Sequence, residues 1–313
     1  MKKQKIFITT ITLIVLFFGI QLNVLSASKT INITDSYLNK EVRRLLNKKT
    51  GALTQVDILK LNALGIPKNT KSLKGLEYAK NLELLDFYQV NASKIDMRPV
   101  SKLSKLQVLS MSESNITEIN FVRNLKNLQH LELADNKVKD ISAISKLSNI
   151  RYLDISKNEI GNITPLKNLN KLETLQMDSN YIINLAPLMN LKRLDIVHMA
   201  DNKIDSITPL KNLNITFANL ENNNIRDISV IKFMPKLGVV LLNSNQIMSI
   251  NVLKGNKSIG KIELKKNNIS DISPLLYMPT LRDVLLYGNP LNQDSSMILN
   301  ALKKKKVHVD DIN

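Results

Sequence analysis

The chain has 313 residues, no cysteine and a formal net charge of +17, with 44 lysines and arginines against 27 aspartates and glutamates. The lack of cysteine excludes disulfides and any lipid anchor attached through a thiol, so burial and backbone pairing must stabilise the fold. The chain contains only three histidines, which disfavours the common forms of acid–base, nucleophilic and metal catalysis.

Residues 1–27 have the order of a secretory signal peptide. Three lysines within the first five residues precede an apolar stretch at residues 6–20, and small residues follow it. A retained membrane anchor is the alternative interpretation, but Gln21 and Asn23 end the apolar stretch short of the roughly 20 residues that a membrane-spanning helix needs. We therefore predict cleavage near Ala27, a secreted protein, and no transmembrane segment after cleavage.

Residues 28–81 lack the pattern of the later chain and predict a helical N-terminal cap. Asp35 is a favourable residue for a helix N-cap, and Gly51 follows the predicted helix. Thr54 resembles the N-cap of a second, shorter helix. The apolar residues that share one face of the first helix are Leu38, Val42, Leu45 and Leu46.

Residues 82–290 repeat one phrase, L··L·L··N·I··I··L··L, in about ten coils of 22 residues. We number each coil from its first Leu or Ile, which is position 0; Leu128, Ile150 and Leu172 are examples. A fixed period in the twenties with Leu and Asn at set positions predicts a leucine-rich-repeat solenoid. Residues 22 apart are then lateral neighbours, and the long open face favours a binding protein over an enzyme.

The buried side of each coil can be assigned from the spacing. Positions 3 and 5 are apolar with a period of two, which predicts a short strand with both side chains facing the core. Positions 10, 13, 16 and 19 close the coil with Ile and Leu. Proline recurs at position 15, where it favours the start of a 3₁₀ turn, as Pro165, Pro187, Pro209 and Pro274.

Position 8 is asparagine in eight successive coils. The side-chain amide is expected to donate and accept hydrogen bonds where the chain leaves the strand. These bonds would satisfy backbone groups that would otherwise be buried without hydrogen-bond partners. We interpret this row as a structural ladder with no role in binding. Its members are Asn136, Asn158, Asn180, Asn202, Asn223, Asn245, Asn267 and Asn289.

Residues 291–313 predict a C-terminal cap that covers the open end of the core. Ile298 and Leu302 share one helical face, and residues 307–309 resemble a final strand. The first coil is also irregular. It runs 24 residues from Leu82, with Val90 at the asparagine position, and this predicts a bulged turn.

Three segments resemble the internalin subfamily of bacterial leucine-rich repeats. They are NEIGNITPLKNLNKL at 158–172, NNISDISPLLYMP at 267–279, and the cap-like LTQVDILKLNALGIPKNTKSLKGLEYAKNLELL at 53–85. The resemblance implies an α/β solenoid: a right-handed horseshoe with a parallel concave sheet, a 3₁₀ or irregular convex side, a helical N-terminal cap and a helix–strand C-terminal cap. It also implies recognition of a protein, typically on a host surface. The absence of a Leu-Pro-x-Thr-Gly signal and of wall-binding repeats suggests a small secreted member without a wall anchor, or a relative outside the virulence-associated group.

Positions 2, 4, 6 and 7 should point out of the concave sheet. They carry an apolar and aromatic row together with acidic groups and two histidines, and such an exposed apolar row with aromatic residues favours a protein-binding surface. Lateral packing between adjacent strands is the competing explanation. The predicted partner-binding residues are Leu84, Tyr88, Val108, His130, Glu132, Tyr152, Asp154, Asp178, Ile196, His198, Phe217, Val239, Leu241, Leu285 and Tyr287.

Charge in these columns opposes the charge of the whole chain. Ten acids against four bases give a net charge of −6, so the concave face should attract basic and apolar groups and exclude nucleic acid, whose phosphates need cations. The bases are Lys157, Lys261, Lys265 and Lys266. The acids are Asp86, Glu113, Glu132, Asp135, Asp154, Asp178, Asp201, Glu221, Glu263 and Asp283.

The sequence predicts no enzyme, no cofactor and no metal site. His130 and His198 lie three coils apart, which is about 14 Å at the spacing of paired strands, so they cannot share one metal ion or one catalytic dyad. We therefore expect a monomeric protein-recognition module. The alternative is an envelope-associated structural protein whose basic convex side binds anionic polymers.

Overall fold

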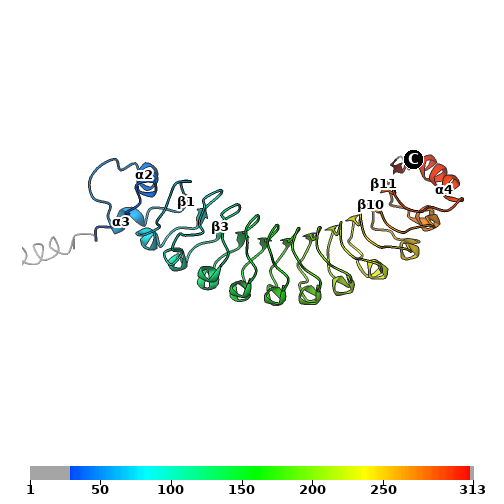
Figure 1. Ribbon diagram of the computed structural model, residues 1–313, viewed down its shortest axis with the longest axis horizontal. Helices are drawn as coiled ribbons and strands as arrows, with labels where there is room; N and C mark the ends of the chain where they lie inside the picture. The colour runs from blue at the N-terminus through cyan, green and yellow to red at the C-terminus, as the bar shows by residue number, and fades with distance from the viewer. Residues whose placement is uncertain (1–28, 311–313) are drawn as a thin grey trace, which may run out of the picture.

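The computed structural model describes residues 29–310, so the predicted signal peptide lies outside the described part of the chain. Stacked coils form an open arc, with strands along the inner side and short 3₁₀ turns along the outer side (Figure 1). The predicted leucine-rich-repeat horseshoe is confirmed. Within the described residues, no helix is both long enough and apolar enough to cross a membrane.

The strands of residues 29–310 form one parallel sheet of twelve strands, each paired with its neighbours in chain order. Eleven of them have three residues, and the middle residue is buried while its two neighbours face outward. The strands are β1 Ala63–Gly65, β2 Leu84–Asp86, β3 Val108–Ser110, β4 His130–Glu132, β5 Tyr152–Asp154, β6 Thr174–Gln176, β7 Ile196–His198, β8 Phe217–Asn219, β9 Val239–Leu241, β10 Lys261–Glu263, β11 Asp283–Leu285 and β12 His308–Val309.

The register places residues of equal position side by side. His130 pairs with Tyr152, and Tyr152 pairs with Thr174, so the predicted lateral neighbours are confirmed. The irregular first coil keeps this register, because Leu84 pairs with Val108 despite their separation of 24 residues. The additional residues are accommodated in the loop after β2, where Val90 is fully buried and Gln89 has a left-handed φ of 58°.

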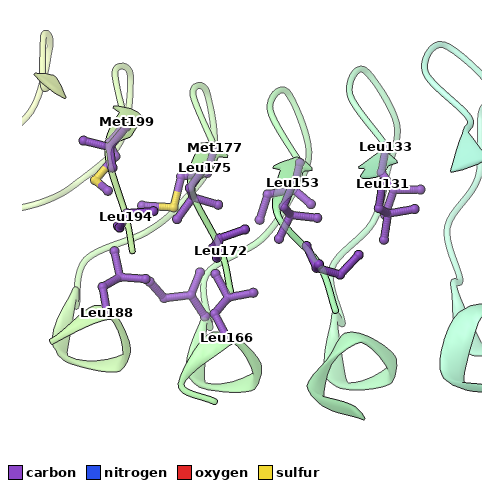
Figure 2. Packing of buried hydrophobic residues seen from close by; sticks show 14 of the residues in the cluster. Leu131, Leu133, Leu153, Leu166, Leu172, Leu175, Met177, Leu188, Leu194 and Met199 are labelled. Carbon is purple, nitrogen blue, oxygen red and sulfur yellow. The ribbon is translucent and has the colours of Figure 1, made fainter. Parts of the chain in front are cut away.

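The core is a continuous stack of aliphatic side chains between the sheet and the outer turns. Leu131, Leu153 and Leu175 from the strand centres are inaccessible to solvent, as are Leu166 and Leu188 from the outer turns. Figure 2 shows these rows meeting between successive coils. A single coil has both faces of its core open, so each coil depends on its neighbours for burial.

Ten 3₁₀ turns on the outer side connect the strands of the described chain. The proline at position 15 occupies the first turn of four of them, as predicted, because its missing N–H needs no partner there. The turns are η1 Leu76–Tyr78, η2 Val100–Lys102, η3 Asn120–Asn124, η4 Ser142–Lys146, η5 Thr164–Leu166, η6 Ala186–Leu188, η7 Thr208–Leu210, η8 Ser229–Phe233, η9 Asn251–Leu253 and η10 Ser273–Tyr277.

The asparagines at position 8 join adjacent coils. Asn158 donates from Nδ2 to the carbonyls of Ile155 and Ser156 in its own coil and of Leu133 in the preceding coil, at 3.1, 3.0 and 2.8 Å. Its Oδ1 accepts the Val138 amide at 2.9 Å. The residue before each asparagine is left-handed, as at Lys157 with φ 51°, and this turns the chain away from the strand.

The N-terminal end begins with α2 Ser36–Leu45 and α3 Gln55–Ile58. Asp35 caps α2 by accepting the Leu38 amide, and Thr54 forms a reciprocal capping box with Asp57. Leu38 and Val42 are buried, whereas Leu45 is 40% exposed and does not join the core face that its spacing predicted. The sheet then starts at β1, within the segment for which the sequence predicted only helices.

The C-terminal end is closed by α4 Ser295–Lys304 and β12, in the order predicted. Ile298 and Leu302 of α4 are buried against the last coil. The Asp310 carboxylate accepts the amides of Leu286 and Tyr287 at 2.7 and 3.1 Å. In inner coils the amide equivalent to that of Leu286 donates to a backbone carbonyl of the following coil, so the Asp310 carboxylate takes the place of that carbonyl.

Candidate functional site: the concave face

The sheet brings the predicted partner-binding residues onto one face in three columns. Position 2 contributes Leu84, Val108, His130, Tyr152, Ile196, Phe217 and Val239, and these lie at the starts of successive strands. Position 4 contributes Glu132, Asp154, His198, Leu241 and Leu285 at the strand ends. Position 6 contributes Tyr88, Asp178 and Tyr287, just beyond the strands.

The apolar row is less exposed than the sequence suggested. Leu84, Tyr88 and Tyr287, at the two ends of the row, are 39%, 55% and 46% exposed. Packing between adjacent strands, the competing explanation from the sequence, leaves the others half-buried. The half-buried apolar members are Val108, Ile196, Phe217, Val239, Leu241 and Leu285.

An aromatic pair occupies the middle of the sheet. The rings of His130 and Tyr152 stack with centroids 4.1 Å apart and planes 3° from parallel. His130 Nε2 lies 2.7 Å from Glu132 Oε1, which fixes the imidazole over the tyrosine. Burial, together with the charges of Asp154 and Glu132, raises the pKa of Tyr152 to about 12, so its hydroxyl remains a neutral hydrogen-bond donor at physiological pH.

A second pair lies three strands further along, on β7 and β8. The His198 and Phe217 rings have centroids 5.0 Å apart and are tilted by 34°. Asp178 lies between the two pairs, and its Oδ1 accepts the Ala200 amide at 2.6 Å. Burial raises the pKa of Asp178 above its ordinary value; the bond from Ala200 opposes this rise, and the charges of Asp201 and Asp154 add to it.

Most of the acids on this face lack a cation within the described chain. Four of the ten form ion pairs: Glu132 with His130, Asp135 with Lys157, and Glu263 and Asp283 with Lys261. The carboxylates without an ion-pair partner among residues 29–310 are Asp86, Glu113, Asp154, Asp178, Asp201 and Glu221. The negative potential of the face is therefore concentrated between β2 and β8.

The structure adds polar residues that the sequence did not single out. Asn243 donates from Nδ2 to both Glu221 and Glu263, and its Oδ1 accepts the Lys265 amide at 2.8 Å. Gln89 donates to Glu113 at 2.9 Å beside Tyr88. Asn243 and Gln89 occupy positions 6 and 7 of their coils, which the sequence predicted to point out of the sheet. They are absent from the predicted binding residues because that prediction rests only on charged, apolar and histidine side chains at these positions.

The two histidines of the concave face lie apart from each other. His130 lies on β4 and His198 on β7, each beside its own aromatic ring. Across residues 29–310 no three histidine, aspartate or glutamate side chains are grouped closely enough to hold a metal ion. The chemistry of the face is that of a surface with aromatic, apolar and anionic groups.

Comparisons with known proteins agree with this fold. A family model for leucine-rich repeats in two copies matches residues 104–146 and 126–168. No curated protein matches the chain. Leucine-rich-repeat folds present extended surfaces for protein–protein recognition.

The solved structures of two bacterial proteins are similar over nearly the whole chain. An internalin, InlF, from Listeria monocytogenes has 26% identity and a TM-score of 0.74, covering 93% of this chain and 95% of that one. Internalin C2 from the same species has 26% identity and a TM-score of 0.58, covering 84% and 98%. The ectodomain of the Arabidopsis thaliana receptor kinase GASSHO1/SCHENGEN3, in complex with CASPARIAN STRIP INTEGRITY FACTOR 2, shares the fold at 19% identity and a TM-score of 0.58, covering 72% and 30%. Together with the repeat phrase and the N-terminal cap, these similarities support an internalin-like bacterial leucine-rich-repeat protein.

Proposed function

We propose that this chain is a secreted, non-catalytic recognition protein that binds a protein partner on its concave face. The observation that carries the proposal is the cluster around Tyr152, where stacked aromatic rings lie near the carboxylates of Asp154 and Asp178, which form no ion pair among residues 29–310. Burying such carboxylates without a counter-charge would be unfavourable, so a partner that supplies one is favoured over a purely apolar partner.

The chemistry of the partner follows from this surface. Half-buried aromatic and aliphatic side chains along β4–β9 offer apolar contact area, and Asp154 and Asp178 offer acceptors for lysine or arginine. Aromatic residues near the centre of an interface contribute most to affinity, and charges contribute more to the rate of association. The plant ectodomain of the same fold, solved with its bound partner, is consistent with this use of the architecture.

The aromatic contribution is tested with Tyr152→Ala/Phe217→Ala in a pull-down of surface proteins from candidate host and neighbouring cells. We expect loss of the captured protein, because both variants remove ring surface from the concave face. Phe233→Ala/Tyr277→Ala is the matched control, since it removes one Phe and one Tyr from outer turns. Capture of every partner at wild-type levels by the concave double variant would refute the assignment of the face.

The acidic contribution is tested on the same captured partner. Asp154→Asn/Asp178→Asn should lower the association rate and weaken its dependence on salt, because steering by opposite charge falls with ionic strength. Asp205→Asn/Asp294→Asn controls for net charge, since neither residue faces the concave sheet. If the association rates of the two variants depended equally on salt, the proposal that the face binds basic groups of the partner would be contradicted.

A further inference from the structure

A polar groove runs beside the concave face, along the edge where the strands begin. Its volume is about 640 Å³, and its lining comes from the segments that lead into β2–β7. Six adjacent strands at about 4.8 Å spacing give it a length of about 24 Å. The groove is therefore elongated across the coils and separate from the aromatic cluster around Tyr152.

The lining is cationic and contains no apolar side chain. It consists of four amide side chains, the carboxylate of Glu83, and the basic groups of Lys105, Arg151, Lys171 and Arg193. The amides come from equivalent positions of successive coils, just before or just after position 0. This composition differs from the concave face, where aromatic and acidic groups predominate.

Three of the four cations have no carboxylate partner within residues 29–310. Lys105 and Lys171 donate to the neutral side-chain oxygens of Asn81 and Asn149, at 2.8 and 2.7 Å. Arg193 is exposed and has no hydrogen bond or ion pair in the described chain. Only Arg151 is neutralised, by Glu173 at 2.8 Å. The groove thus retains positive charge next to amide groups that both donate and accept.

We propose that this groove binds an acidic polysaccharide. Arginine and lysine bind carboxylate or sulfate groups, and amide side chains exchange hydrogen bonds with sugar hydroxyls. A length of about 24 Å suits an extended chain with spaced anions. The groove offers a protein partner no apolar centre of the kind that protein interfaces use. It also offers a single-stranded nucleic acid no aromatic rings on which its bases could stack.

The proposal goes beyond protein recognition, because it uses other residues and another class of ligand. It also differs from the convex-side polymer binding considered from the sequence, since Lys105 and Lys171 act here as members of a shaped groove and not as part of a diffuse basic surface. An acidic glycan could then be held while a protein occupies the concave face.

The experiment measures binding to dextran sulfate, with neutral dextran as the uncharged probe. Lys105→Gln/Lys171→Gln/Arg193→Gln should weaken binding about tenfold or more, because each lost group pairs with an anion. The matched control is Lys146→Gln/Lys167→Gln/Lys257→Gln, which removes the same three positive charges at exposed positions outside the groove. It should weaken binding less than about threefold. The groove variant keeps Arg151 with Glu173, so no buried or paired charge is uncovered.

Three outcomes would overturn the proposal. These are equal losses in the two triple variants, binding of neutral dextran as strong as that of dextran sulfate, and displacement by polydeoxythymidylate at the same concentration of charges. Tyr152→Ala/Phe217→Ala should bind dextran sulfate as wild type does. The glycan-binding proposal for the groove and the protein-binding proposal for the concave face are therefore tested with separate variants and separate ligands, so one can fail without the other.

Discussion

At the scale of single residues, the asparagines at position 8 link adjacent coils through side-chain hydrogen bonds to the backbone. Asn180 is 5% exposed and makes four hydrogen bonds: Nδ2 donates to the carbonyls of Ile155, Met177 and Asp178, and Oδ1 accepts the Ile160 amide. At the same position of the second coil, Ser114 donates its hydroxyl only to carbonyls of Phe87 and Ser112. Asparagine suits the site because it combines a donor and an acceptor at the necessary reach.

Asn180→Ala should lower the free energy of unfolding by about 1–3 kcal/mol, because it leaves buried backbone groups without partners. Urea denaturation of the two proteins measures the difference. Asn170→Ala is the control, since this side chain is exposed and is not part of the ladder. A midpoint unchanged by Asn180→Ala would show that the ladder contributes nothing measurable.

At the scale of secondary-structure elements, the short helix α3 depends on its capping box. The amide and hydroxyl of Thr54 donate to Asp57 Oδ2 at 2.9 and 2.7 Å, and Lys48 Nζ lies 2.6 Å from the same oxygen. These bonds from Lys48 and Thr54 hold the pKa of Asp57 well below its ordinary value of 3.8. The box fixes the entry of the chain into β1, where the sheet begins.

The depressed pKa makes the N-terminal end sensitive to acid. Asp57 contributes its full stabilisation above the ordinary pKa of about 3.8, and this contribution is lost as the pH falls toward the lower pKa of the folded state. Asp57→Asn should thus lower stability at about pH 6 and reduce the further loss on going to about pH 3. Denaturation at both pH values measures this. Asp294→Asn, at a position without a side-chain cap, should keep the wild-type dependence.

At the scale of the whole molecule, each coil contacts only its neighbours, so a defect at one end should stay local. Leu302 of α4 is 1% exposed and covers the end of the core. Leu302→Ala should cost about 2–5 kcal/mol of local stability. Hydrogen exchange should then accelerate in β10 and β11 while β3 and β4 keep their protection. Uniform acceleration in all strands would instead indicate a single cooperative unit.

The sequence determined the repeating part of the fold because its physical causes are local and periodic. Strand centres such as Leu153, the 3₁₀ turns at Pro165 and Pro209, and the caps at Asp35 and Thr54 follow from spacing and residue type alone. Lateral neighbours such as His130 and Tyr152 followed from the period of 22, as did the columns of the predicted binding surface.

The tertiary structure decided what depends on distances between coils. Half-burial of Val108 and Phe217, stacking of His130 on Tyr152, and the burial that raises the pKa of Asp178 arise from side-chain packing across strands, which a repeat pattern does not specify. The edge groove was also found only in the structure: Lys105, Lys171 and Arg193 each precede position 0 of their coils and so share one column, but the repeat pattern does not show that this column lines a groove. The first strand and the Asp310 cap lie outside the repeat, where the period gives no information and only pairing with the adjacent coil defines the structure.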